Sequence, residues 1–161
     1  MLSRIPVWFY VEYAMPRILI IDDQAHVRAA VLAALRANKF EAVGFEDGAA
    51  GLRAFEASPF DAAIVDIYMP GIDGIKLMRT LRELSPQLPI VAMSGVLLGL
   101  SDSTALDFLS KAPGLSEIVC LKKPFRSSEL LEALHQAIIA TVHIQPKTET
   151  AAEQYIVFGD T

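Results

Sequence analysis

The chain has 161 residues, a formal net charge of -5 at pH 7, and 53% hydrophobic residues. This length accommodates one compact domain with a real core and leaves no room for a second folded domain. The acidic balance, without a run of Lys or Arg, argues against direct nucleic-acid binding, which needs clustered positive charge. A single cysteine, Cys120, excludes an internal disulfide and a CxxC zinc site, and it is expected in a reducing cytoplasm.

The first 14 residues are apolar, but the run from Ile5 to Val11 is too short to span a bilayer and makes a poor signal peptide. The patterned part of the chain starts at Pro16, so Met15 is interpreted as an alternative or true start. The predicted boundaries are an extension at residues 1–15, one domain at 16–141 and a C-terminal tail at 142–161.

From Arg17 onward, strand-like and helix-like segments alternate. Apolar, β-branched runs predict strands at Ile18–Ile21, Glu41–Phe45, Asp61–Val65, Pro89–Met93 and Glu117–Leu121. Helical periodicity predicts helices at about Gln24–Asn38, Asp47–Ala57, Asp73–Leu84, within Ser101–Lys111, and from Ser127 to Thr141. Parallel strands need crossover helices, so this alternation predicts an α/β fold: a doubly wound five-stranded parallel sheet with five helices on its two faces.

Polar residues stand at the carboxyl ends of these predicted strands: Asp22 and Asp23, Asp66, Ser94 and Lys123. In open α/β sheets this edge is where ligands bind. Carboxylates gathered there repel one another by a few kcal/mol per pair at about 4 Å, so a hard cation such as Mg²⁺ is expected among them. Lys123 and the Ser94 hydroxyl suit phosphoryl oxygens. The set therefore predicts phosphoryl transfer.

The strings RILIIDD, DIYMPGIDG, MSG and LKKPF occur in this order and resemble the receiver domains of two-component response regulators, over roughly residues 16–141. The resemblance implies a flavodoxin-like sheet of strand order 2-1-3-4-5. It also implies that Asp66 accepts a phosphoryl group from the phosphohistidine of a sensor histidine kinase or histidine phosphotransfer protein.

The remaining site roles are likewise implied by the resemblance. Mg²⁺ would be held by Asp22, Asp23, Asp66 and the backbone carbonyl of Tyr68. Ser94 and Lys123 would bind the phosphoryl oxygens, and the peptide bond before Pro124 would be cis. Such a domain is a signalling module rather than an enzyme, with at most self-catalysed phosphorylation and dephosphorylation.

Two features depart from the family pattern. The position three residues before Lys123, where the family usually has an aromatic residue that changes rotamer, is Cys120. Output would then depend on loop movement or on another side chain, or it would be weak. Ser94 and Lys123 are also 29 positions apart, so an irregular loop and helix are expected at Val96–Leu115.

The sequence leaves three functions open. The first is a phosphoacceptor whose output is a downstream protein partner, with a homodimer or heterodimer as a further option. The second is a degenerate receiver that acts as a constitutive binding module. The third is a Mg²⁺-dependent phosphohydrolase, but such enzymes usually show Asp-x-Asp and a cap domain, whereas this chain has Asp22-Asp23.

Other polar residues have plainer interpretations. Asp73 is expected to cap a helix and Lys122 to be a solvated neighbour of Lys123. The histidines, His26, His135 and His143, are expected on or beside helices, at the surface or partly buried, without a phosphotransfer role.

Overall fold

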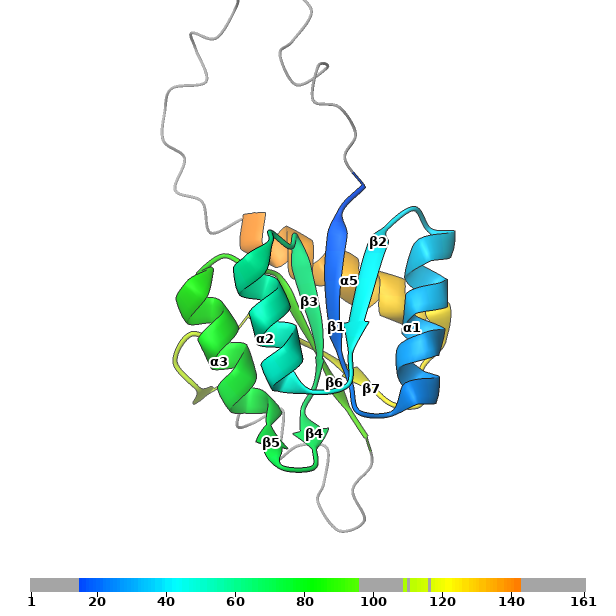
Figure 1. The fold of residues 1–161 in the computed structure, drawn as a ribbon. Helices are drawn as coiled ribbons and strands as arrows, with labels where there is room; N and C mark the ends of the chain where they lie inside the picture. The colour runs from blue at the N-terminus through cyan, green and yellow to red at the C-terminus, as the bar shows by residue number, and fades with distance from the viewer. Residues whose placement is uncertain (1–14, 96–108, 110, 116, 143–161) are drawn as a thin grey trace, which may run out of the picture.

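The computed structural model describes residues 15–95, 109, 111–115 and 117–142 (Figure 1). A five-stranded parallel sheet of order β2-β1-β3-β6-β7 forms its centre. The strands are β1 (Arg17–Ile21), β2 (Glu41–Phe45), β3 (Ala62–Asp66), β6 (Ile90–Ser94) and β7 (Val119–Lys122). Counted along the chain among these five strands, the order is 2-1-3-4-5, so the expected doubly wound sheet is confirmed.

Four helices cover the sheet in the described part of the chain: α1 (Ala25–Ala37), α2 (Gly48–Ala57), α3 (Gly74–Leu84) and α5 (Ser127–Val142). Helices α1 and α5 pack on one face, and α2 and α3 on the other (Figure 1). None of these helices is long and apolar enough to cross a membrane. The predicted helix within Ser101–Lys111 lies largely outside the described residues, as do the extension before Met15 and most of the tail.

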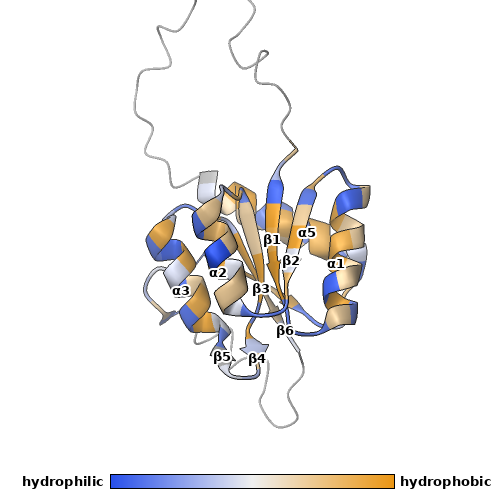
Figure 2. Ribbon diagram, viewed as in Figure 1, coloured by the Kyte–Doolittle hydropathy of each residue, from blue (hydrophilic) through white to orange (hydrophobic). Residues whose placement is uncertain are grey.

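The sheet is buried on both faces, which explains its continuous apolar strands. In β1, Ile18 and Ile20 pack toward α1 and α5, whereas Leu19 and Ile21 pack toward α2 and α3. All of these four side chains are fully buried. Figure 2 shows hydrophobic residues along the central strands, whereas the helices carry both hydrophobic and hydrophilic residues.

One feature of the fold was not expected from the sequence. The segment after β3 contains two short antiparallel strands, β4 (Tyr68–Met69) and β5 (Ile72–Asp73), where the sequence indicated only a loop. Gly71 lies in the turn between them with φ of 73°, a conformation that glycine adopts readily. Strands of two residues have no periodicity, so the sequence pattern could not reveal them.

Helix α3 begins directly after this hairpin. The Asp73 carboxylate accepts hydrogen bonds from the backbone N–H groups of Ile75 (2.9 Å) and Lys76 (3.4 Å), which confirms its predicted role as a cap. At Gly74 an added Cβ would lie 2.3 Å from the carbonyl oxygen of Asp66. Glycine is therefore required for the close approach between α3 and the end of β3.

Candidate functional site

The topology brings the predicted site residues to one edge of the sheet. Asp22 follows β1, Asp66 ends β3, Ser94 ends β6 and Lys123 follows β7. Because β1 pairs with β3, β3 with β6, and β6 with β7, these strand ends are neighbours. Single carboxylate oxygens of Asp22, Asp23 and Asp66 lie within 4.8 Å of one another.

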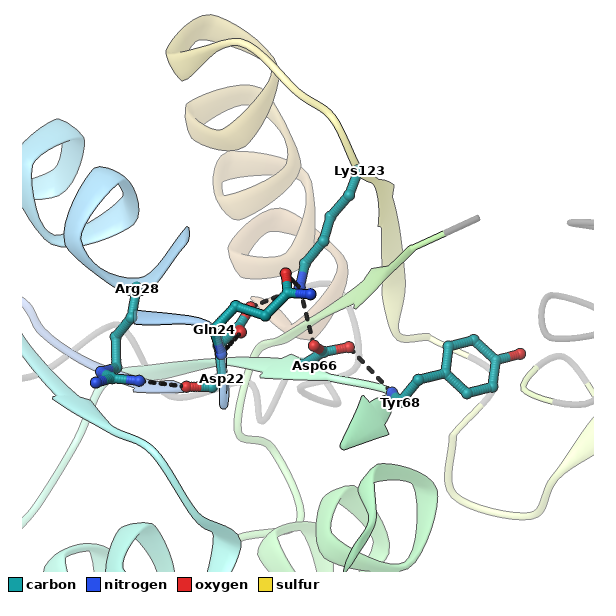
Figure 3. Close-up of polar contacts among 6 residues, drawn as sticks. All are labelled: Asp22, Gln24, Arg28, Asp66, Tyr68 and Lys123. Atoms are coloured by element: carbon teal, nitrogen blue, oxygen red, sulfur yellow. Dashed lines mark hydrogen bonds and ion pairs between the residues drawn. The ribbon is translucent and has the colours of Figure 1, made fainter. Parts of the chain in front are cut away.

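Lys123 connects the two buried carboxylates. Its Nζ donates to Oδ2 of Asp22 at 2.7 Å and to Oδ2 of Asp66 at 2.8 Å (Figure 3). The exposed fractions of the three side chains are 12% for Lys123, 0% for Asp22 and 4% for Asp66. One ammonium group balances only one of these carboxylates, and exposed Asp23 adds further negative charge, so the site favours an additional cation.

The second oxygen of each buried carboxylate is also hydrogen-bonded. Oδ1 of Asp22 accepts the backbone N–H of Gln24 at 2.8 Å, and Oδ1 of Asp66 accepts that of Tyr68 at 3.0 Å. A carboxylate oxygen has two acceptor sites, so each retains a lone pair for a further ligand. These contacts fix the orientation of both carboxylates, while the Tyr68 ring points away from Asp66 (Figure 3).

Burial and ion pairing shift the pKa values of Asp66 and Lys123. Burial raises the pKa of Asp66 above its usual 3.8; Asp22 adds to this, whereas Lys123 and the Tyr68 N–H oppose it. Burial alone would lower the pKa of Lys123, but its hydrogen bonds and ion pairs with Asp22 and Asp66 outweigh this and raise the pKa above 10.5. Lys123 is therefore a cation at neutral pH.

A cleft of about 550 Å³ gives access to Asp66 from the surface. Its lining residues come from the start of α1 and from the ends of β3, β6 and β7: Gln24, His26, Val27, Ala30, Asp66, Tyr68, Gly95, Lys123, Pro124 and Phe125. The Lys123–Pro124 peptide bond on its rim is cis, as expected. The cleft is large enough to admit a phosphoryl group together with part of a donor.

Two predicted ligands, the Ser94 hydroxyl and the Tyr68 carbonyl, lie near this site, but no contact in the described part of the chain tests their roles. Ser94 is half-buried, and its backbone carbonyl accepts the Lys123 N–H at 2.7 Å. The Ser94 hydroxyl as a phosphoryl ligand and the Tyr68 carbonyl as a metal ligand therefore stay predictions.

Sequence reasoning missed two residues that surround Asp22. Gln24 Oε1 lies 3.5 Å from Lys123 Nζ, and Arg28 Nη1 donates to the Asp22 backbone carbonyl at 2.7 Å. The available signal was their position: Gln24 follows the aspartate pair directly, and Arg28 comes one helical turn later.

The donor set fits Mg²⁺. Asp22, Asp23 and Asp66 offer carboxylate oxygens, the ligands that this cation prefers, and they sit beside a cleft where water and phosphate oxygens could supply the rest of its shell. Asp23 is exposed, so its carboxylate can adjust to an ion with little loss of packing.

Comparison with known proteins decides the family. Residues 18–135 match the family model of the response regulator receiver domain. The chain belongs to this family. It is 31% identical over 126 residues to the response regulator receiver protein CpdR of Brucella abortus, covering 78% of this chain and 99% of that one.

Another relative and a solved structure are also similar to this chain. The receiver domain is 33% identical over 114 residues to the transcriptional regulatory protein PrrA of Mycobacterium tuberculosis, of which it spans 48%. A crystal structure of a response regulator receiver protein from Sinorhizobium medicae superposes with a TM-score of 0.67 at 27% identity, covering 81% of this chain and 99% of that one.

The remaining residues singled out from the sequence differ in exposure. Cys120 is half-buried against the core between the sheet, α2 and α3, and burial raises the pKa of its thiol to about 11. His26 and His135 are exposed, as is Lys122, whereas His143 lies beyond the described residues.

Proposed function

We propose that this receiver domain is a Mg²⁺-dependent phosphoacceptor in which Asp66 takes a phosphoryl group. The observation that carries the proposal is the position of the Asp66 carboxylate, which lines the cleft and is held between the Lys123 ammonium and the Tyr68 N–H. Asp22 and Asp23 lie close enough to hold a cation beside it.

The transfer step follows from this arrangement. An Asp66 carboxylate oxygen attacks the phosphorus of a phosphohistidine on a sensor histidine kinase or histidine phosphotransfer protein. A phosphorus–oxygen bond forms, the phosphorus–nitrogen bond breaks, and its electron pair returns to the imidazole of the donor. The residues that would hold Mg²⁺ are Asp22, Asp23, Asp66 and the Tyr68 carbonyl, and the ion would neutralise phosphoryl charge.

The chain's own polar groups perform the rest. Lys123 is already charged and already touches Asp66, so it can pair with a phosphoryl oxygen without a large displacement. Ser94, at the end of β6, would donate its hydroxyl to another phosphoryl oxygen. We assign residues 16–141 to this domain and residues 142–161 to a tail.

The proposed output is a change in affinity for another protein, through a downstream partner or a homodimer, in the cytoplasm. Direct nucleic-acid binding is not part of the proposal, because the chain carries a net charge of -5. The domain would have no turnover beyond self-catalysed phosphorylation and dephosphorylation.

Intact mass spectrometry after incubation with acetyl phosphate tests the proposal. With Mg²⁺, the protein and an Asp61→Asn control should each gain one phosphoryl group, and Asp66→Asn should gain none. Asp61 suits as a control because it immediately precedes β3, whereas Asp66 ends that strand. Without Mg²⁺ the gain should vanish. A folded protein that gains no mass with Mg²⁺ would instead favour the degenerate binding module.

A further inference from the structure

Arg82 of α3 is buried, which is unusual for an arginine. It lies in the last turn of the helix with an exposed fraction of 9%. Its Nη1 donates to the Pro86 carbonyl at 3.2 Å and lies 3.9 Å from Oε2 of Glu117. Its Nε and Nη2 are buried and have no hydrogen-bond partner within the described part of the chain.

The two unpartnered nitrogens form one edge of the guanidinium group. Nε–H and Nη2–H point the same way, and their spacing matches the two oxygens of a carboxylate or a phosphate, which this edge can bind as a fork. Buried donors without partners destabilise a fold, so a ligand that accepts both bonds has a clear energetic advantage. Burial also lowers the pKa of Arg82, with the charge of Glu117 opposing this, so a second anion would compensate for the lost solvation.

Arg82 is one of the residues that line a cleft of about 400 Å³. Its walls come from α3 and from the turn that precedes β7, with lining residues Arg79, Arg82, Glu83, Pro113, Gly114 and Leu115. Space is available on the turn side, because a Cβ added at Gly114 would meet no atom within 4 Å.

The charges around the cleft impose selectivity. Arg79 is exposed and adds positive charge, whereas Glu83 and Glu117 are exposed and negative. The overall charge is therefore balanced, and a simple anion such as chloride has little reason to accumulate. An anion with two oxygens that can use the vacant fork gains directed bonds as well as charge.

This cleft is separate from the phosphoacceptor site. Gly74, at the start of α3, packs against the carbonyl of Asp66, but Arg82 is eight residues further along the helix. That separation corresponds to about 12 Å along the helix axis. The two sites can therefore be tested independently.

We propose that the Nε–Nη2 edge of Arg82 is an oxyanion-binding site, with a carboxylate or a phosphate as its ligand. A carboxylate would come from an acidic side chain or a C-terminus of a partner protein. A phosphate would come from a phosphorylated group or from the free ion.

The test uses the full chain, with NMR detection of the Arg82 Nε–H resonance during titration with sodium acetate, sodium phosphate and sodium chloride at equal ionic strength. A saturable shift with acetate or phosphate, and none with chloride, is expected. Response to acetate alone identifies a carboxylate site, and response to phosphate identifies a phosphate site. The same response is expected in Asp66→Asn, so failure of the phosphoacceptor proposal would leave this result unchanged.

Arg82→Lys keeps the charge but removes the fork, whereas Arg53→Lys alters an exposed arginine on α2 as a control. Anion binding to the variants is followed through the rise in melting temperature. Compared with the unaltered chain, the anion concentration at half-saturation should be about tenfold higher or more in Arg82→Lys and should be unchanged in Arg53→Lys. If Arg82→Lys does not fold, the titration of the unaltered chain decides alone. No shift with either oxyanion, or an equal shift with chloride, overturns the proposal.

Discussion

Replacing Lys123 by methionine removes the ammonium group that lies between two buried carboxylates. In the metal-free protein, Asp22 and Asp66 would then face each other with exposed fractions of 0% and 4% and without the cation that now contacts both. Removing one partner of a buried ion pair typically destabilises a protein by about 3 to 5 kcal/mol. We therefore expect Lys123→Met to lower the free energy of unfolding substantially at pH 7.

The loss of unfolding free energy has an upper limit, or ceiling, because Asp66 can take up a proton instead of remaining charged. Protonating a carboxyl group with an ordinary pKa of 3.8 at pH 7 costs about 4 kcal/mol, at about 1.4 kcal/mol per pH unit. The expected loss at pH 7 is thus about 3 to 4 kcal/mol. At pH 5 the same ceiling falls to less than about 2 kcal/mol.

The sign of the pH dependence follows from the direction of the pKa shift. The substitution raises the pKa of Asp66 further above its unfolded value. A group with a raised folded pKa contributes stability below its unfolded pKa and loses that contribution as pH rises through its folded pKa. The destabilisation caused by Lys123→Met should therefore grow between pH 5 and pH 7.

Urea unfolding in the presence of EDTA at both pH values measures this loss. Lys76→Met, at an exposed position on α3, is the matched control and should change the unfolding free energy by less than about 0.5 kcal/mol. A loss below about 1 kcal/mol at pH 7, or an equal loss at both pH values, would show that Lys123 does not neutralise the buried carboxylates.

Three further substitutions or reactions test the surroundings of the site. Gly74→Ala should destabilise the protein by about 1 to 3 kcal/mol or more in urea unfolding, because the new Cβ would lie 2.3 Å from the Asp66 carbonyl; unchanged stability would contradict the close approach. Asp73→Ala should cost about 1 kcal/mol in the same assay through loss of the α3 cap, and a neutral result would contradict that role. Cys120, with a pKa of about 11, should react much more slowly with a thiol reagent at pH 8 in the native protein than in urea, and equal rates would contradict its burial.

The sequence predicted the position of the site because two buried apolar runs each end in an aspartate. Ile18–Ile21 and Ala62–Val65 are fully buried runs, and each is followed by a buried aspartate. Such a run can only be a central strand or a buried helix, and its short length favours the strand. Parallel strand order then places the aspartates at one edge, so their proximity could be predicted without coordinates.

Contacts that depend on side-chain reach could not be predicted in the same way. The approach of Gln24 to Lys123 joins residues 99 positions apart and depends on how two flexible side chains extend. Arg82 looks like an ordinary surface residue in the sequence, since arginine is rarely buried, yet its exposed fraction is 9% and its Nη1 donates to the Pro86 carbonyl. Neither contact leaves a periodic pattern in the sequence.

The proposed function depends on Asp66 as the residue that carries the phosphoryl group, and chemical mapping of the phosphorylated residue tests this assignment. After incubation with acetyl phosphate and Mg²⁺, borohydride reduces an aspartyl phosphate to homoserine, which peptide mass spectrometry can locate. Homoserine is expected at position 66 and at no other aspartate. Homoserine at Asp22 or Asp23, or reduction at no position in a folded protein that has gained phosphoryl mass, would contradict it.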